Sequence, residues 1–226
     1  MRYLNVVKGR FIHRPNRFIA HVDIGGKVET VHVKNTGRCR ELLTPDAEVY
    51  LAAGLNPARR TAYDLIAVKK SHRLINMDSQ APNKVFDEWV RGGGFLPDVT
   101  SIWPEYTVGQ SRLDFALQTE KGFHYVEVKG VTLEVEGAVY FPDAPTERGV
   151  KHLNELRRAA EAGIDATAAF VVQMEQVKFL SPNDVTHPAF GEALRAAKAA
   201  GVNVRAFTCH VEPDSLEICG EIPVIL

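Results

Sequence analysis

Hydrophobic and polar residues alternate along two neighbouring stretches in the middle of the chain, residues 112–117 and 124–130. In the first stretch apolar side chains flank Asp114, and in the second they flank Glu127 and Lys129. This is the two-residue period of a half-buried β-strand, and residues 120–123 between the stretches have the composition of a turn. The pattern therefore predicts a β-hairpin whose polar side chains share an exposed face.

The polar face of this hairpin is a candidate site for a cation and a phosphate group. It carries the carboxylates of Asp114 and Glu127 and the ammonium group of Lys129. Mg²⁺ is typically held by one or two carboxylates together with phosphate oxygens. The alternative is ordinary surface chemistry, with a solvated carboxylate at Asp114 and a weak ion pair between Glu127 and Lys129. Spacing alone favours neither interpretation.

From Arg10 to about Met77 the chain consists of short β-type segments with little that is typical of a long amphipathic helix. Strands are predicted at residues 18–24, 28–33, 48–52 and 63–68, with a hairpin turn at Gly25-Gly26 and a short helical piece at 40–43. Several short strands without helices between them are typical of a small closed barrel of the OB kind. We assign residues 1–80 to this OB-like barrel.

Helices and strands alternate in the remainder of the chain, residues 81–226. The predicted order is a helix ending at Gly92, strand 103–108, the hairpin, strand 132–141, helix 147–162, strand 165–173, helix 188–200, strand 202–209 and a last strand at 217–221. A strand, a helix and a strand in succession predict a right-handed crossover with a parallel central pair. We therefore expect an α/β domain with a mixed central sheet and with the polar site at one sheet edge.

The net charge of −1 is divided unevenly along the chain. Residues 1–80 hold 14 Lys and Arg against 7 Asp and Glu, a net of +7, and the remainder holds 13 against 21, a net of −8. A basic N-terminal part is typical of a surface that binds a polyanion, and an acidic remainder suits carboxylates that bind a metal. Two differently charged but inert halves are the alternative.

The cysteine spacing and the lengths of apolar runs bear on where in the cell the protein is expected. The three cysteines, Cys39, Cys209 and Cys219, are widely spaced, which argues against a zinc site or a disulfide scaffold. No apolar run reaches the length of about eighteen residues that a membrane span requires, and the first residues lack the apolar core of a secretory signal. We therefore expect a cytoplasmic location.

Two groups of basic residues are candidates for nucleic-acid binding. They are Arg14, Arg17, Arg38 and Arg40 in the barrel, and Arg148, Lys151 and His152 in the helix predicted at 147–162. An OB barrel that binds single strands combines a positive groove with aromatic side chains on which bases stack. At the start of a helix, backbone N–H groups add to the attraction for phosphate. A solvated surface is the alternative for the helix group, and core packing is the favoured alternative for the barrel aromatics Phe11 and Phe18.

Asp114, followed about a dozen residues later by Glu127-Val-Lys129, resembles the core signature of the PD-(D/E)XK nuclease superfamily. The flanking runs 127–133 and 140–156, together with segments 35–42, 78–83 and 111–115, resemble the sugar fermentation stimulation protein A family over essentially the whole chain. The resemblance implies an OB-type barrel joined to a restriction-endonuclease-like α/β domain that binds DNA. In the nuclease superfamily a helix ahead of the hairpin often adds a carboxylate, which makes Glu88 a candidate third metal ligand. Its alternative is a solvated helix face.

Together these features favour metal-dependent phosphodiester hydrolysis. Asp114 and Glu127 are expected to hold Mg²⁺ or Mn²⁺, and Lys129 to orient water or stabilise charge on the phosphate. DNA is the expected partner, bound with little sequence preference, and RNA stays open as an alternative. The competing hypothesis is a non-catalytic DNA-binding regulator of sugar catabolism, of the maltose type, on the same scaffold. The sequence gives no indication of oligomeric state.

Overall fold

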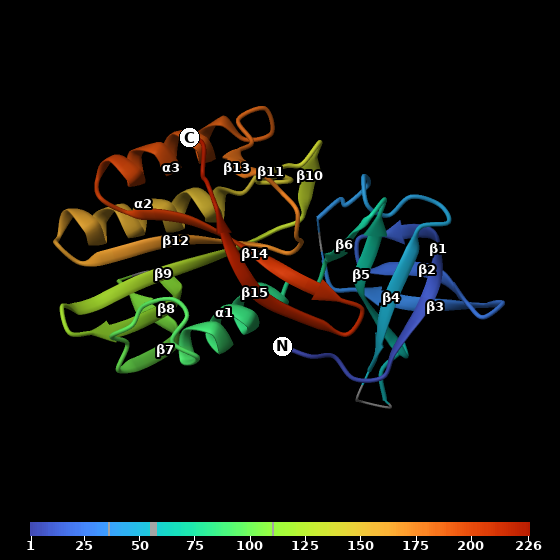
Figure 1. Ribbon diagram of the computed structural model, residues 1–226. Helices are drawn as coiled ribbons and strands as arrows, with labels where there is room; N and C mark the ends of the chain where they lie inside the picture. Colours follow the sequence, from blue (N-terminus) through green and yellow to red (C-terminus); the bar gives the residue numbers. More distant parts are fainter. Residues whose placement is uncertain (36, 55–57, 110) are drawn as a thin grey trace.

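The structure, a computed structural model, describes residues 1–35, 37–54, 58–109 and 111–226. It has two parts, a β-barrel and a larger α/β domain, which lie side by side (Figure 1). Strand β6 of the barrel ends at Asn76, and helix α1 of the α/β domain begins at Ala81. Among the described residues, none of the helices has the length and apolar character needed to cross a membrane.

The barrel contains six strands, of which five close on themselves. The strands are β1 (Val6–Asn16), β2 (Ile19–Ile24), β3 (Lys27–Val33), β4 (Glu48–Ala53), β5 (Tyr63–Lys70) and β6 (Arg73–Asn76). Their order is β3-β2-β1-β4-β5-β6, and a parallel pairing of β3 with β5 closes the barrel. The OB-like barrel is therefore confirmed. The short helix expected at 40–43 is instead a single turn, in which Leu42 and Leu43 both donate to the carbonyl of Cys39.

The α/β domain is built on a mixed six-stranded sheet of order β15-β14-β12-β9-β8-β7. Its elements are α1 (Ala81–Arg91), β7 (Ser101–Val108), β8 (Ser111–Thr119), β9 (Gly122–Val131), β10 (Leu133–Val135), β11 (Ala138–Phe141), α2 (Glu147–Glu161), β12 (Asp165–Val172), β13 (Phe179–Pro182), α3 (Pro188–Ala199), β14 (Asn203–Glu212) and β15 (Ser215–Ile222). Strands β9, β12 and β14 are parallel, and β7, β8 and β15 are antiparallel to their neighbours. The crossover pattern predicts the pair β12–β14, whereas the other parallel neighbour of β12 is β9 and not the strand expected at 132–141. A small sheet of β10, β11 and β13 lies beside them.

Helices cover both faces of the large sheet (Figure 1). On one face α1 packs Val85, Phe86 and Val90 against apolar side chains of β8, β9 and β12. On the other face α2 and α3 pack against the alternate residues of the same strands, among them Phe170. Two covered faces explain why β12 is almost continuously apolar, since a parallel strand buried on both sides cannot alternate with polar residues.

Two expectations about the hairpin region require correction. The hairpin face that carries Glu127 was expected to be exposed at a sheet edge, but β9 lies between β8 and β12 and is covered by α2. Glu127 is accordingly only 2% exposed. The single strand expected at 132–141 is a second hairpin, β10–β11, because Glu136 and Gly137 have positive φ angles of 53° and 85° and turn the chain.

A buried polar network joins the barrel to the α/β domain. The side chain of Gln173, just after β12, donates to Oδ1 of Asn76 at 2.9 Å and to the carbonyl of Asp78 at 3.1 Å. The fully buried Asp78 carboxylate accepts from Lys34 at 2.6 Å and from Tyr3 at 3.2 Å. Burial, with the nearby charge of Asp78, raises the pKa of Tyr3, so its hydroxyl stays a donor. This network fixes the position of the two domains relative to each other.

Candidate active site

Asp114 lies where β8 separates from β9. The paired register between the two strands runs from Thr119 and Gly122 to Phe115 and Val126, and Asp114 is the next residue of β8. Its Oδ2 accepts from the backbone N–H of Val128 at 2.8 Å, and its Oδ1 accepts from Nδ2 of Asn83 at 2.8 Å. The carboxylate therefore holds β8, β9 and the first turn of α1 together at one point.

Glu127 projects from β9 toward helix α2. Its Oε1 accepts hydrogen bonds from Nζ of Lys129 and from Nδ1 of His152, which lies on α2. Its Oε2 is buried and has no hydrogen-bond partner among the described residues. A buried carboxylate oxygen without a donor is costly, and such an atom in a native site calls for a ligand to balance it.

The two carboxylates have opposite pKa shifts. Burial raises the pKa of Asp114, and the negative charge of Glu127 raises it further, against the opposing effects of Lys129 and the Val128 N–H. Burial also acts to raise the pKa of Glu127, but hydrogen bonds from His152 and Lys129, with the Lys129 charge, hold it below its usual value. Glu127 is thus anionic at neutral pH. The groups around Asp114 only partly compensate the negative charge of its ionised carboxylate, so its pKa stays raised.

The donor set at this site fits a hard divalent cation. The described residues contain no group of three His, Cys, Asp or Glu side chains close enough to hold a metal among themselves. Asp114 and the unpartnered Oε2 of Glu127 offer two oxygen ligands, which is the number that Mg²⁺ sites commonly use before waters and phosphate oxygens complete them. A cation there would also relieve the repulsion that raises the pKa of Asp114.

The structure does not bring Glu88 to Asp114 and Glu127. The Glu88 carboxylate is 2.7 Å from the amino group of Met1 and its side chain is 59% exposed. On α1 it follows Asn83, the residue that contacts Asp114, by five positions. Five residues turn a helix by about 140° beyond a full turn, so Glu88 faces a different direction.

His152 has a different position from the one expected of a phosphate contact. It is 5% exposed and lies between α2 and the sheet, where its Nδ1 donates to Oε1 of Glu127. The buried stripe of α2 contains Gly149, His152, Leu153 and Leu156, whereas Val150 is only partly buried. That set has the i, i+3, i+4, i+7 spacing of a helix face, which is the sequence signal that identifies His152 as inward-facing.

The two other predicted residues of α2 remain at the surface. Arg148 is exposed, and its Nε lies 3.4 Å from Nε2 of His152. Lys151 is exposed beside an open cavity of about 570 Å³ between α2 and the β7–β8 turn, which Arg158 also lines. These cations therefore flank the Glu127 side of the site from one helix.

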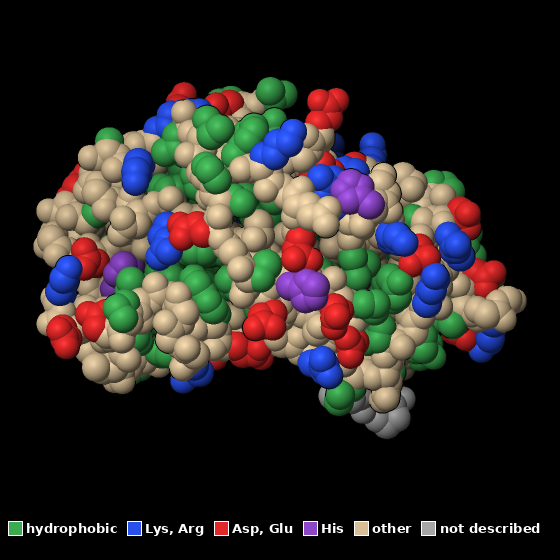
Figure 2. Space-filling view, viewed as in Figure 1, with side chains coloured by type: hydrophobic (Ala, Val, Ile, Leu, Met, Phe, Trp, Pro, Cys, Tyr) green, Lys and Arg blue, Asp and Glu red, His purple; other side chains and the backbone are tan. Residues whose placement is uncertain are grey.

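The barrel arginines divide into a structural residue and three surface residues. Arg14 donates to the carbonyls of Arg17, Asn35, Gly37 and Arg38 at 2.6–3.0 Å, so it orders the loop after β3 rather than facing a ligand. Arg38 and Arg40 are exposed, and Arg17 is exposed with its guanidinium 5.5 Å from the centre of the Phe18 ring. On the face shown in Figure 2, Lys and Arg side chains of the barrel are interspersed with Asp and Glu rather than gathered in one patch.

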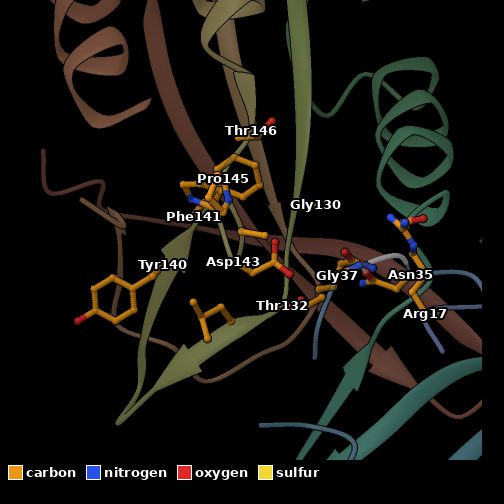
Figure 3. A pocket seen from close by; sticks show the side chains of 15 residues that line it. Arg17, Asn35, Gly37, Gly130, Thr132, Tyr140, Phe141, Asp143, Pro145 and Thr146 are labelled. Carbon is orange, nitrogen blue, oxygen red and sulfur yellow. Dashed lines mark hydrogen bonds between the residues drawn. The ribbon is translucent and has the colours of Figure 1, made fainter. Parts of the chain in front are cut away.

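A cavity of about 430 Å³ lies between the barrel and the α/β domain (Figure 3). Arg17, Asn35 and Gly37 line it from the barrel side, and Gly130 and residues 140–146 line it from the other side. Gly130 directly follows Lys129 on β9, and Thr146 is the N-cap of α2, whose side chain accepts from Gly149 N–H at 3.1 Å. The cavity therefore adjoins the Asp114–Glu127–Lys129 group at the carboxyl end of β9.

Comparison with known proteins gives matches to both domains. Residues 12–77 match a family model described as the SfsA N-terminal OB domain, and residues 80–215 match the sugar fermentation stimulation protein RE domain. The chain is 53% identical over all 226 residues to a sugar fermentation stimulation protein homolog of Clostridium beijerinckii, with 100% of both chains covered. It is 53% identical over 217 residues to a homolog from Desulfitobacterium hafniense, covering 96% of this chain and 95% of that protein.

A solved structure is similar over the whole length. The structure of Pyrococcus furiosus SfsA in complex with Ca²⁺ aligns with a TM-score of 0.89 at 28% identity, and the alignment covers 100% of this chain and 98% of that one. The similarity includes both the barrel and the mixed sheet, so the arrangement of the two domains is shared.

Proposed function

Because the chain belongs to the sugar fermentation stimulation protein family, we propose that it is a DNA-binding protein whose α/β domain hydrolyses phosphodiester bonds with a divalent cation. One observation carries the proposal. Asp114 accepts a hydrogen bond from the N–H of Val128, the residue between Glu127 and Lys129, and the buried Oε2 of Glu127 has no partner among the described residues. This is the donor set that a phosphate-directed Mg²⁺ or Mn²⁺ site uses.

The residues of the chain have distinct roles in this proposal. Asp114 and Oε2 of Glu127 hold the cation, which when bound lowers the pKa of a coordinated water and neutralises charge on the phosphate. Lys129 donates one of its three N–H groups to Glu127 and has the others for a phosphate oxygen or the attacking water. His152 fixes the orientation and charge of Glu127 from α2, as partners of metal ligands commonly do.

The solved relative supports a metal in this family. It is a structure of SfsA from Pyrococcus furiosus in complex with Ca²⁺, and its fold matches this chain over the whole length. Ca²⁺ prefers oxygen ligands, as Mg²⁺ does, although it takes longer bonds and more ligands. A carboxylate site for such a cation in this chain is consistent with Asp114 and Glu127.

Exposed cations on both domains would bind the nucleic-acid backbone. Arg17, Arg38 and Arg40 are available on the barrel, and Arg148 and Lys151 lie on the surface of α2. Contacts of this kind position the strand without reading its sequence, so we propose binding with little sequence preference and with steep salt dependence.

One observation favours the competing function, a DNA-binding regulator without catalysis. Lys129 and His152 already contact Oε1 of Glu127, and the described residues supply no third metal ligand. A site with its charge balanced in this way could serve phosphate contact alone. The two functions differ in one measurable property, cleavage of the bound strand.

The decisive experiment pairs binding with cleavage. Labelled single- and double-stranded DNA and RNA are incubated with the protein and Mg²⁺, Mn²⁺ or EDTA, alongside Asp114→Asn and Lys129→Ala. Glu161→Gln is the matched control, since this exposed carboxylate lies at the far end of α2 and pairs with Arg157. Metal-dependent cleavage that is lost in both site variants, while binding is retained, supports the nuclease. Salt-sensitive binding without cleavage under any metal supports the regulator.

A further inference from the structure

The side-chain amide of Gln173 lines the cavity between the domains and is held in one orientation by hydrogen bonds. Gln173 is 2% exposed, and its Nε2 donates to Oδ1 of Asn76 and to the carbonyl of Asp78. The backbone N–H of Asp78 also donates to Oδ1 of Asn76 at 3.1 Å, which identifies that atom as the oxygen. Both partners of Gln173 Nε2 are therefore acceptors, so the amide can be oriented in only one way.

This orientation leaves the carbonyl oxygen of Gln173 as an acceptor facing the cavity. Gln173 lines the cavity, and the hydrogen bonds of its side chain in the described part of the chain involve only Nε2. A Cβ atom on Gly130 would lie 2.7 Å from Oε1 of Gln173 and 2.6 Å from Cγ of Pro82. Because residue 130 is glycine, the oxygen is not obstructed.

Asp143 provides a second acceptor from the opposite side of the cavity. In Figure 3 its side chain points from the α/β domain toward Gly37 and Asn35 of the barrel. A Cβ atom on Gly37 would lie 2.4 Å from Oδ2 of Asp143, so the absence of a side chain at Gly37 allows this approach. Two oxygen acceptors from different segments thus line the same cavity.

The remaining lining supplies an apolar surface and a positive charge. The Phe141 ring is half-buried, with its centre 5.0 Å from that of Phe190 and 5.6 Å from that of Phe170, and it also lines the cavity. Arg17 contributes the positive charge at the barrel side. Aromatic surface, fixed acceptors and one cation are the groups that bind a base and an adjoining phosphate.

We propose that this cavity holds one unpaired nucleotide of a single strand and selects a base that carries an exocyclic amino group. The inference rests on the proposed function, because it names the strand on which the Asp114–Glu127–Lys129 group acts. The volume of about 430 Å³ lies in the lower part of the range of small-molecule pockets, about 300–1,000 Å³. Such a cavity does not accommodate a duplex. The amino groups of cytosine, adenine and guanine each carry two N–H donors, enough for Gln173 and Asp143 together, whereas unpaired thymine has only the single N3–H donor.

The test measures binding in EDTA, so that cleavage does not interfere. Fluorescence anisotropy compares a labelled single strand, the same strand without its bases, and a blunt duplex. The variant is Ala144→Trp, which fills the cavity from its half-buried lining residue Ala144, and the control is Ala189→Trp at an exposed position of α3. Removal of the bases should weaken binding to the wild-type protein about tenfold or more.

The effects of Ala144→Trp and of base removal on single-strand affinity should depend on each other. Ala144→Trp should weaken single-strand binding by a similar factor but leave duplex binding within about twofold, and removal of the bases should have no further effect on this variant. A cytosine strand should also bind the wild-type protein more tightly than a thymine strand. Equal binding of all strands by wild-type protein and Ala144→Trp would overturn the proposal.

Other outcomes separate this inference from the nuclease. Metal-dependent cleavage together with unchanged single-strand binding in Ala144→Trp would reject the nucleotide-binding role of the cavity and support the nuclease. The predicted binding pattern without cleavage under any metal would support the nucleotide-binding role of the cavity and reject the nuclease. Binding of free deoxycytidine monophosphate, with no loss of strand binding in Ala144→Trp, would assign the cavity to a free nucleotide and overturn its role in holding a strand.

Discussion

Nδ1 of His152, on helix α2, is hydrogen-bonded to Oε1 of Glu127, on strand β9. Both side chains are almost fully buried, and Lys129 contacts the same oxygen. This contact determines which oxygen of Glu127 is occupied and leaves Oε2 without a hydrogen-bond partner among the described residues. Helix α2 therefore acts on the proposed metal site through Glu127.

Replacing His152 should weaken the site without removing its carboxylates. In His152→Asn the pKa of Glu127 should rise, because a hydrogen bond from His152 is among the effects that hold it down. Loss of such an orienting partner typically reduces metal affinity or activity by about 10–100-fold. Titration with Mn²⁺ and the rate of DNA cleavage measure the two effects. His72→Asn, at an exposed position, is the control, and equal Mn²⁺ affinity in both variants would argue against the role of His152.

Replacing Glu88 should leave the metal site intact. The Glu88 carboxylate pairs with the Met1 amino group at 2.7 Å and its side chain is 59% exposed, so Glu88→Gln should cost at most about 1 kcal/mol of stability. Mn²⁺ affinity should match that of the wild-type protein, whereas Asp114→Asn should lose it. A parallel loss of affinity in Glu88→Gln would restore Glu88 as a ligand.

Arg14 and Arg17 should respond in opposite ways to substitution by alanine. Arg14→Ala removes a charged donor from four loop carbonyls and should lower the free energy of unfolding by about 2 kcal/mol. Arg17→Ala should leave stability nearly unchanged, because Arg17 is exposed, but should reduce the slope of log affinity for DNA against log salt concentration by about one. Urea unfolding and salt-dependent binding distinguish them. A stable Arg14→Ala with weakened binding would reverse the assignment.

Acid should release the contact between the barrel and the β10–β11 hairpin. Burial alone would raise the pKa of Glu134, but hydrogen bonds from Lys70 and from Gly137 N–H, together with the charges of Lys70 and Arg73, lower it below 4.5. A carboxylate with a lowered folded-state pKa adds stability that is complete above the unfolded value and disappears as pH falls through the folded value. Wild-type stability should therefore fall below about pH 4.5 more steeply than that of Glu134→Gln.

Urea midpoints between pH 7 and pH 3 measure this difference. At neutral pH Glu134→Gln should be less stable by about 2 kcal/mol, because Lys70 and Arg73 lose a buried partner. Glu217→Gln, an exposed carboxylate on β15, provides the control. Identical pH profiles for wild-type protein and Glu134→Gln would exclude Glu134 as the source of the acid sensitivity.

The sequence predicts the parts of this protein that depend on local pattern. The crossover rule gives the parallel pair β12–β14, but the other parallel neighbour of β12 is β9 and not the strand expected at 132–141. Alternation around Asp114 and Glu127 is sufficient to place both on adjacent strands. It does not place Glu127 in the interior, because that depends on the later helix α2 folding back over β9. Arg14 illustrates the same limit, since its four acceptors lie in the β1–β2 turn and in the loop after β3, and no periodic pattern in the sequence predicts the path of these segments.

Glu88 and His152 show how helix direction decides which side chains meet. Both lie on helices that were correctly expected, but a helix presents only one stripe to the sheet. For α2 the spacing of Gly149, His152 and Leu156 contains that information. For α1 the contact of Asn83 with Asp114 determines the direction, and no feature of the sequence marks Asn83 as that residue.

The network of Gln173, Asn76 and Asp78 has a mechanical consequence. Because these buried side chains hold the barrel rigidly against the α/β domain, the opening between them has its width before any ligand arrives. A protein with two hinged lobes grips its substrate by closing, and it can adapt to strands of different thickness. On the function proposed above, this protein would instead admit or reject a strand by the dimensions of a preformed gap, and that gap would accept an unpaired strand.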